Sequence, residues 1–399
     1  MKTRTKTGLA LATACVVLCF AVVCGLAACT SSSSSSAASS ASASVSASAA
    51  SASASSASAS AASASASSSA AASETVSFTD SAGRTVDVPA NIERVAISGP
   101  ISQMVLLTLA PEKLVGLSNE LSDAELKYVA GQYKDLPVFG QIYGGKGDFN
   151  KEAVASADPQ IVIDIGEAKK TIVEDLDGIQ ESIGIPCVHI EASFNSYDEA
   201  YKLLGKLLGV EDRANALADY CTKAYQEATA VVEAIPEADR VKVLYLLGND
   251  GTNVMGKGSF QGTVVDKCAD NLAVLEKVGG SGLGNESSLE QIAVWNPAMI
   301  IFAPDSIYST VGDDATWQTL DAVANGNYYE VPGTPYNWIS SPPGINQILG
   351  YQWFARLCYP DKFSDSIADI AKGYYKTFYQ YDLTDAECDE LIANSVPKN

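Results

Sequence analysis

The chain has 399 residues, of which 26 are Lys or Arg and 47 are Asp or Glu, so its formal net charge is −21. Nucleic acids and anionic membrane surfaces are bound through positive patches, and this balance therefore argues against both as partners. The single histidine, His189, lies in the apolar run 186–190 and is expected to be a strand residue. With one histidine, a Ser-His-Asp triad or a zinc site of several histidines is hard to build. We therefore expect no catalytic residue, no cofactor and no metal ligand.

The N-terminus has the composition of an export signal. Lys2, Arg4 and Lys6 precede a long apolar run that ends in Leu-Ala-Ala-Cys29. This ending resembles the bacterial lipoprotein signal, which implies removal of residues 1–28 and acylation of Cys29. A transmembrane anchor is the alternative, because the apolar run is long enough to span a bilayer. Both alternatives place the protein outside the cell membrane and tether it there.

Residues 29–73, which begin with Cys29, are almost all Ser and Ala. They have no large apolar side chains to bury, so they cannot offset the entropy of ordering, and we expect a disordered, extended tether. A tether of this length suggests a surface protein that reaches through a cell wall, on the outer face of a Gram-positive type of envelope. The rest of the chain is long enough for two domains with their own cores.

Beyond the tether, short apolar runs alternate with helical segments. Residues 78–89 predict a hairpin around an Ala-Gly turn. Buried strands are expected at residues 94–97, 114–117, 160–165 and 187–190, and a helix at residues 197–208. Strands that alternate with helices predict a parallel α/β sheet.

A longer helical stretch follows. Residues 211–235 contain neither Gly nor Pro, and as one helix they would extend about 37 Å, at roughly 1.5 Å per residue. Such a helix suits a rigid strut between two lobes, and at Val241 a second set of alternating strands and helices begins. We therefore predict an α/β protein with two Rossmann-like lobes that contain parallel sheets. The lobes are residues 74–210 and 237–399, and a single long interlobe helix, residues 211–236, joins them.

One segment occurs twice, once in each lobe. Residues 150–163 and 288–301 each contain a polar residue before a short helix, a Glu in its first turn, a Pro at its exit and an apolar β-branched run. These glutamates are Glu152 and Glu290. A Glu in the first turn is also favoured by the helix dipole and by capping, and Ser287 with Glu290 fits a capping box. Two lobes of similar architecture imply a cleft between them, where ligands bind.

Four of the nine cysteines lie in or end the signal region. The other five, which show no metal-site spacing, are Cys187, Cys221, Cys268, Cys358 and Cys388. Because their number is odd, at least one is unpaired. We expect buried, small apolar residues with at most one or two disulfides, whose pairing stays open.

The loops at the carboxyl ends of the strands supply the candidate ligand residues, because ligands of open α/β sheets bind there. Two of these loops place a lysine among glycines, one in each lobe, which suits an oxyanion or a carboxylate-rich chelate. A flexible turn with a solvated lysine is the alternative for each, and each aromatic residue can equally belong to the core. The candidates are Ser98, Gly99, Pro100, Tyr143, Lys146, Glu167, Met255, Lys257, Ser259, Phe260, Tyr336, Asn337 and Trp338.

Residues 251–258 nearly match the nucleotide-binding loop G-x-x-x-x-G-K-[ST]. Gly258 stands where that loop requires Ser or Thr, so the hydroxyl that binds Mg²⁺ is absent from its place. An exported protein also meets little ATP. We therefore do not expect nucleotide hydrolysis, and we expect a binding protein rather than an enzyme.

The order of these segments resembles the class III substrate-binding lipoproteins of ABC importers, which bind iron-siderophore, haem and cobalamin complexes. The resemblance rests on the two Glu-bearing segments and on three stretches, DSAGRTVDVPANIERVAI, PEKLVGLS and PYNWISSPPGINQILGYQWFARLCYP. It extends from about Thr75 to the C-terminal helices. It implies two α/β lobes with limited hinge motion, and docking of Glu152 and Glu290 on basic residues of the membrane permease dimer.

From this resemblance we expect a monomeric protein that captures a ferric siderophore or a similar metal chelate and delivers it to an ABC importer permease. The lysine loops favour an anionic ligand, and haem, cobalamin or a molybdate-type oxyanion are the alternatives. An enzyme or a sensor on the same scaffold is the alternative of a different class, although no nucleophile motif favours an enzyme.

Overall fold

The computed structural model describes residues 74–144, 148–279 and 282–398. The predicted signal peptide, Cys29, the predicted tether and Lys146 lie outside these ranges. Within them, no helix combines the length and the apolar composition that crossing a membrane requires.

Strand and helix alternate along most of the described chain. The strands are β1 (Thr75–Thr79), β2 (Thr85–Pro89), β3 (Val95–Ile97), β4 (Ile161–Gly166), β5 (Cys187–Glu191), β6 (Lys242–Leu247), β7 (Asn253–Val254), β8 (Asp270–Asn271), β9 (Met299–Phe302) and β10 (Tyr328–Glu330). The α-helices are α1 (Pro100–Leu109), α2 (Asp123–Glu125), α3 (Lys151–Ser156), α4 (Ile172–Ile183), α5 (Tyr197–Leu208), α6 (Glu211–Val232), α7 (Thr263–Cys268), α8 (Leu289–Trp295), α9 (Tyr308–Val311), α10 (Asp321–Ala324), α11 (Asn346–Cys358), α12 (Ile367–Tyr374) and α13 (Asp385–Ile392). Short 3-10 or π-helical turns are η1 (Pro111–Lys113), η2 (Leu126–Ala130), η3 (Gly131–Tyr133), η4 (Glu237–Asp239), η5 (Trp317–Thr319), η6 (Pro360–Lys362) and η7 (Tyr375–Tyr379).

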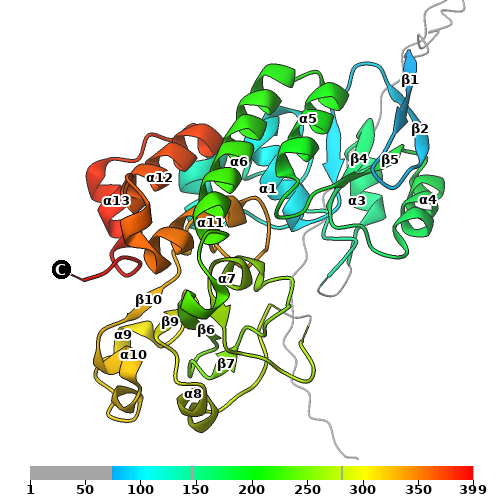
Figure 1. Ribbon diagram of the computed structural model, residues 1–399. Helices are drawn as coiled ribbons and strands as arrows, with labels where there is room; N and C mark the ends of the chain where they lie inside the picture. Colours follow the sequence, from blue (N-terminus) through cyan, green and yellow to red (C-terminus); the bar gives the residue numbers. More distant parts are fainter. Residues whose placement is uncertain (1–73, 145–147, 280–281, 399) are drawn as a thin grey trace, which may run out of the picture. The chain divides into compact units, whose positions relative to one another are not determined.

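In the first lobe, β3, β4 and β5 form a parallel sheet with β4 in the middle. The sheet is buried on both faces, which explains why its strands are nearly continuous apolar runs. The face that includes Ile163 packs against α1, α5 and α6, and the face that includes Val162 packs against α3 and α4 (Figure 1). The antiparallel hairpin β1–β2 lies beside β5, where the main-chain N–H of Ser81 donates to the carbonyl of His189.

In the second lobe, β6 is the central strand and pairs in parallel with β8 and β9, and β9 pairs in parallel with β10. β7 is antiparallel to β6. The face that includes Tyr245 and Ile301 packs against α7 and α11, whereas the face that includes Leu244 and Ile300 packs against α8, α9 and α10. Each lobe is therefore a sheet covered by helices on both faces, as the alternating pattern predicts.

The helix α6 joins the two lobes and packs against α5, α1 and α11 (Figure 1). Its last α-helical residue is Val232, a few residues before the predicted end. After it, the main-chain N–H groups of Ala234 and Ile235 donate to carbonyls three residues earlier instead of four, so the α-helical pattern has ended. The cause is Pro236, because a proline disfavours helical geometry in the residue that precedes it. The fold is thus α/β, with two Rossmann-like lobes that contain parallel sheets and are joined by one long helix.

Two sequence-based expectations differ from the structure in detail. Residues 114–117 form no strand; Leu114 bridges Val95, and Leu117 bridges Val138, so the segment changes partner along its length. The cap of α8 is Ser288, whose Oγ accepts from the main-chain N–H of Gln291, and not Ser287. The five cysteines of the described chain are buried, as expected, and all of them are free.

The packing of α11 predicts a sharp difference between two Gly→Ala substitutions. A Cβ on Gly350 in α11 would lie 1.9 Å from the carbonyl oxygen of Trp338, whereas a Cβ on Gly178 in α4 would meet nothing within 4 Å. We expect Gly350→Ala to destabilise the fold by about 1–3 kcal/mol or more through overpacking. Gly178→Ala should stabilise it by roughly 0.5–1 kcal/mol, because Ala favours a helix interior over Gly. Urea unfolding of both variants measures this, and equal effects would contradict the packing described.

Candidate functional site

A pocket of about 90 Å³ lies at the carboxyl ends of β3 and β4, and we call it the Ser98 pocket. Most of its lining comes from the first lobe, and Phe260 comes from the second lobe. This position, at the strand ends and bounded by both lobes, is where open α/β proteins bind ligands. Its lining residues are Ser98, Gly99, Pro100, Ile101, Ser102, Tyr143, Asp164, Ile165, Gly166, Glu167, Lys169 and Phe260.

The start of α1 forms one side of the Ser98 pocket. Ser98 follows β3, Gly99 is the N-cap residue, and Pro100 is the first helical residue, where the missing N–H of proline costs nothing. No side chain caps this helix, so the first main-chain N–H groups of α1 have no side-chain acceptor. At the carboxyl end of β4, Gly166 has a φ of 146°, a backbone conformation that would be strained in a residue with a side chain.

Asp164 of β4 anchors a buried hydrogen-bond network beneath the Ser98 pocket. Its Oδ1 accepts from the hydroxyl of Ser98 at 2.5 Å, and its Oδ2 lies 2.7 Å from Nδ1 of His189. His189, in β5, is completely buried, and its Nε2 lies 3.4 Å from Oε2 of Glu191. Burial lowers the pKa of the His189 imidazole, but the hydrogen bonds and charges of Asp164 and Glu191 outweigh burial, so the pKa is raised overall.

Two further lining residues have perturbed acid–base properties. The hydroxyl of Tyr143 donates to Oδ2 of Asp175 at 3.0 Å, and burial together with this carboxylate raises the pKa of Tyr143. Burial raises the pKa of Glu167, nearby Lys169 lowers it, and Glu191 raises it, with a net increase. Both pKa shifts show that the wall of the pocket contains polar and charged groups that are only partly solvated.

A second pocket, of about 380 Å³, lies at the carboxyl ends of β6 and β9 in the second lobe, and we call it the Tyr336 pocket. Tyr336 and Asn337 line it, together with Gly248 after β6 and Pro304 after β9. Asn337 is nearly buried and held on both sides: it donates to the hydroxyl of Tyr245 and accepts from the main-chain N–H groups of Ile339 and Ser340. Its side chain is therefore fixed before any ligand binds.

The structure gathers eight of the thirteen predicted ligand residues at these two strand-end pockets. Ser98, Gly99, Pro100, Tyr143, Glu167 and Phe260 line the Ser98 pocket, and Tyr336 and Asn337 line the Tyr336 pocket.

The other predicted ligand residues lie elsewhere. Met255, Ser259 and Trp338 are buried, with Trp338 packed edge-on against Trp353 in the core. Lys257 lines neither pocket and pairs with Asp270 at 3.2 Å. Lys146 lies outside the described residues. Of the two glycine-loop lysines, the structure therefore describes only Lys257, and it places that residue outside both strand-end pockets.

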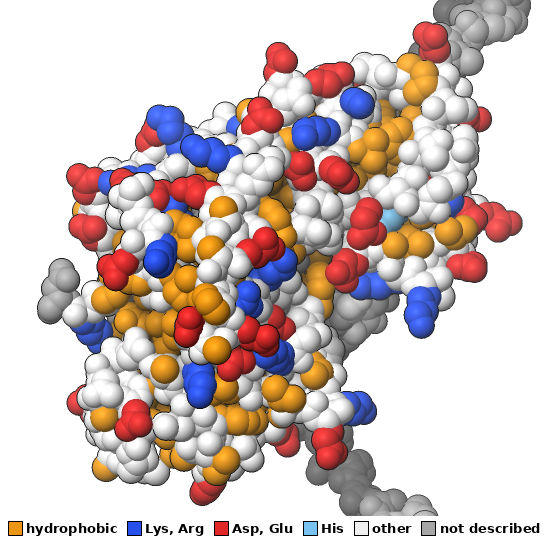
Figure 2. Space-filling model, in the orientation of Figure 1, with side chains coloured by type: hydrophobic (Ala, Val, Ile, Leu, Met, Phe, Trp, Pro, Cys, Tyr) orange, Lys and Arg blue, Asp and Glu red, His pale blue; other side chains and the backbone are white. Residues whose placement is uncertain are grey.

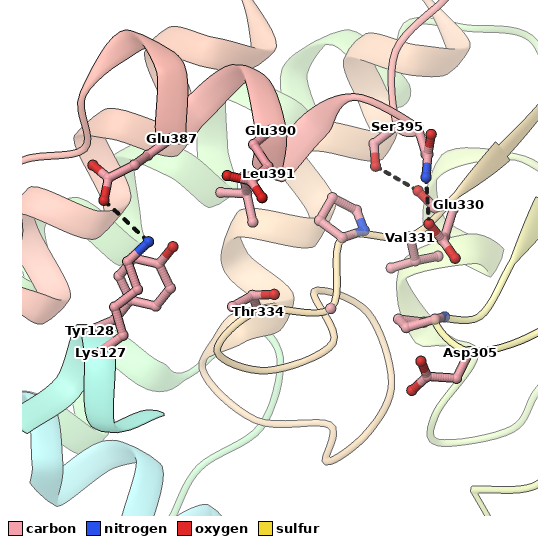
Figure 3. Close-up of a pocket in the computed structure, with 14 residues that line it drawn as sticks. Lys127, Tyr128, Asp305, Glu330, Val331, Thr334, Glu387, Glu390, Leu391 and Ser395 are labelled. Atoms are coloured by element: carbon pink, nitrogen blue, oxygen red, sulfur yellow. Dashed lines mark hydrogen bonds and ion pairs between the residues drawn. The ribbon is translucent and has the colours of Figure 1, made fainter. Parts of the chain in front are cut away.

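A roomier pocket, of about 480 Å³, lies between α13, η2 and the loops after β9 and β10 (Figure 3). We call it the α13 pocket, and no predicted ligand residue lines it. Its polar groups largely satisfy one another: Lys127 pairs with Glu387 at 3.1 Å, and Glu330 accepts from Asn394 and, through its carbonyl, from Ser395. This internal pairing makes it a weaker candidate than the strand-end pockets.

The two glutamates of the repeated segment are exposed and line none of these three pockets. Glu152 lies in the first turn of α3, capped by Asn150, and Glu290 lies in the first turn of α8, capped by Ser288. Main-chain and Ser288 hydrogen bonds lower the pKa of Glu290, so it is ionised at neutral pH. Lys and Arg side chains stand among Asp and Glu on the face in Figure 2, and no broad basic patch covers that face.

Sequence reasoning missed the floor of the Ser98 pocket. Ser102, Asp164 and Lys169 line it but were not among the predicted residues. One signal was present: Asp164 is the only charged residue in the apolar run of β4, and a buried strand rarely carries a charge without a partner. In the described chain, no cluster of three or more His, Cys, Asp or Glu side chains could hold a metal ion.

The buried network predicts how stability depends on pH. The pKa of His189 is raised in the folded state, so its contribution to stability is complete below the ordinary histidine pKa of about 6.5 and is lost as pH rises through the folded value. We expect the stability difference between the natural chain and His189→Asn to shrink between pH 6 and pH 9. Urea unfolding of both proteins measures it, and a difference that stays constant or grows with pH would contradict the network.

Comparison with known proteins identifies the family. The family model described as periplasmic binding protein matches residues 109–335 of this chain. Among solved structures, the chain is similar to an ABC transporter solute-binding protein from Sulfurospirillum deleyianum, with 27% identity and a TM-score of 0.73 over 79% of this chain and 99% of that one. It is also similar to a periplasmic solute-binding protein from Veillonella parvula, with 26% identity and a TM-score of 0.67 over 81% and 98%.

A third structure, the molybdate-binding protein MolA of Haemophilus influenzae, shares the fold at 18% identity and a TM-score of 0.60 over 77% of this chain and 99% of that one. No curated protein matches the sequence. Because the family model spans more than half of the chain, the protein belongs to the periplasmic binding protein family, whose members are solute-binding proteins of ABC importers.

Proposed function

We propose that the protein captures a ferric siderophore or a similar metal chelate outside the cell and delivers it to the permease of an ABC importer. The observation that carries this proposal is the Ser98 pocket, which lies at the strand ends of the first lobe and includes Phe260 of the second. The family works outside the cytoplasm, which agrees with the predicted export signal. We further propose that the protein is a monomer that acts as a binding protein rather than an enzyme, anchored through a lipid on Cys29.

The proposed ligand contacts fall into two groups. Ser98, Tyr143 and Glu167 offer polar groups on the first lobe, and Phe260 offers an aromatic surface beside them. On the second lobe, Tyr336 and Asn337 line the Tyr336 pocket, where Tyr336 offers its ring because its hydroxyl is buried. An aromatic surface with a few polar groups is the usual composition of a small-molecule site.

The neighbours with solved structures differ in what they bind. The Haemophilus protein is named for molybdate, and a Helicobacter pylori protein of 18% identity holds nickel. At such identities the likeness concerns the fold, so the ligand of this chain has to be determined by direct binding. Haem, cobalamin and oxyanions remain alternatives to a ferric siderophore.

Native mass spectrometry with a panel of candidate ligands tests the proposal. The panel contains ferrioxamine, ferric citrate, haem, cobalamin and molybdate, and we expect one of the ferric chelates to bind. Phe260→Ala should then weaken binding by about tenfold, or about 1.4 kcal/mol, because it removes the aromatic wall. Tyr133→Ala, an aromatic truncation outside the three pockets described above, is the matched control. Binding of none of the panel, or equal losses in both variants, would contradict the proposal.

We propose that Glu152 and Glu290 dock onto the permease, because each is an exposed, ionisable group on one lobe and lines none of the pockets. Glu152→Ala and Glu290→Ala should leave ligand affinity and stability nearly unchanged, since exposed charges contribute little to folding. Uptake through the reconstituted importer should fall at least tenfold in each. Glu181→Ala, an exposed glutamate on α4, is the control and should transport normally. A loss of ligand affinity equal to the loss of transport would refute the docking role.

A further inference from the structure

His189 is the only histidine in the chain and lies completely buried under the Ser98 pocket. Both of its ring nitrogens face carboxylates: Nδ1 is 2.7 Å from Asp164, and Nε2 is 3.4 Å from Glu191. An ionised carboxylate only accepts hydrogen bonds, so both ring nitrogens have to carry a proton to satisfy these contacts. The geometry therefore favours an imidazolium cation between two carboxylates, in agreement with the raised pKa of His189.

The charge of Asp164 in turn fixes the direction of the hydrogen bonds above it. Ser98 donates its single hydroxyl hydrogen to Asp164. Ser102 lies 2.9 Å from Ser98, so Ser102 has to donate to Ser98, while it accepts the main-chain N–H of Ile165. The hydroxyl of Tyr143 likewise donates its hydrogen to Asp175. All three hydroxyls that line the pocket thus point their hydrogens into the protein.

We propose that His189 is a positioning residue for ligand binding: held as an imidazolium by Asp164 and Glu191, it fixes the hydroxyl directions in the pocket wall and links binding to its own proton. This inference rests on the Ser98 pocket being the ligand site proposed above. His189 does not touch the pocket itself and acts through Asp164 and the two serines.

The fixed hydroxyl directions define the ligand chemistry that this wall accepts. Ser98, Ser102 and Tyr143 can offer only lone pairs, and Glu167 adds a carboxylate, so the wall accepts hydrogen bonds. The donors among the described lining groups are Lys169 and the main-chain N–H groups at the start of α1. A ligand therefore has to place a donating group, such as an ammonium, an amide N–H or a metal-bound water, against the serines. This differs from the purely anionic ligand that the glycine-loop lysines suggest.

Loss of the His189 proton would leave Asp164 and Glu191 without the cation that lies between them, and the wall would rearrange. Every element around His189 contributes titratable or charged groups to this balance. On the elements packed around β5, these groups are Asp80 and Arg84 from the β1–β2 hairpin, Asp164 from β4, Glu167 from the following loop, Asp175 and Asp177 from α4, Tyr197 from α5, and Cys187 and Glu191 from β5 itself.

Nuclear magnetic resonance of the full chain without ligand tests the proposal, because its one histidine gives one set of ring signals. With ¹⁵N-labelled histidine, we expect both ring nitrogens to be protonated at pH 6.5 and to titrate above the ordinary histidine value of about 6.5. The main-chain amide signals of Gly99, Ile101 and Ser102 should move with the same midpoint. A merely structural histidine would leave those amides unchanged.

Two variants and a control sharpen the outcome. Glu191→Gln removes one carboxylate that is 42% exposed, so it should fold normally, and it should lower the midpoint of both the ring and the amide signals. Asp164→Asn should lower it further. Glu174→Gln, on the exposed part of α4, should leave it unchanged.

A neutral His189 ring at pH 6.5 would overturn the proposal. Amide signals of Gly99, Ile101 and Ser102 that do not change as His189 titrates would overturn it as well. Because no ligand is present, this result does not depend on the ligand assignment. Failure of the whole ligand panel to bind would instead count against the proposed function.

Discussion

The packing of α6 against helices of both lobes is the constraint on which the rest of the structure depends. The buried face of α6 consists largely of small residues, among them Ala214, Ala218 and Ala228, which allow neighbouring helices to approach closely. A Cβ on Gly205 of α5 would lie only 2.4 Å from the Cβ of Ala214, so the backbones of α5 and α6 approach too closely for a side chain at Gly205. One apolar core runs from the strands of the first lobe through α6 to the strands of the second.

Polar contacts fix the same junction. Arg213 of α6 donates to the carbonyls of Thr108 at the end of α1 and of Phe378 in η7. Arg356 of α11, which is 3% exposed, pairs with Glu227 of α6 and with Asp365. Separating a buried cation from its carboxylate partners is expensive, because the charge would then lie in a poorly solvated place without compensation. The junction therefore favours small adjustments between the lobes over wide opening, and this suits a site whose wall is already formed.

The arrangement of side chains beneath the Ser98 pocket also follows from the need to give buried polar groups hydrogen-bond partners. Asp164 is tolerated in a buried strand because Ser98 and His189 satisfy its two oxygens. The network in turn sets the start of α1, whose main-chain groups border the pocket. The same few hydrogen bonds therefore hold Asp164 in the core and border the Ser98 pocket, so under our proposal His189 influences both stability and recognition.

Sequence reasoning predicted those features that depend on local periodicity. The strands β4 and β5 and the helix α5 lie within a residue or two of their predicted positions, because long apolar runs and a glycine stop specify them. The loops after β3 and β4 were predicted as ligand loops because strand ends are defined by the same runs.

The rest depends on which side chains meet in three dimensions. Lys257 looked available in a glycine loop, but Asp270 lies within reach of it once β8 pairs with β6. Trp338 looked like a site residue, but the turn before α11 buries it against Trp353. The partnership of Asp164 and His189 joins neighbouring strands at a register that periodicity alone does not specify.

The most direct test of the account is a crystal structure of the protein with the chelate that binds most tightly. The account predicts electron density in the Ser98 pocket, with a donating group of the ligand against Ser98 and Ser102, contact with Phe260, and little change in the packing of α6. Density in the α13 pocket instead, or a ligand held by one lobe with the lobes rotated apart at α6, would contradict it.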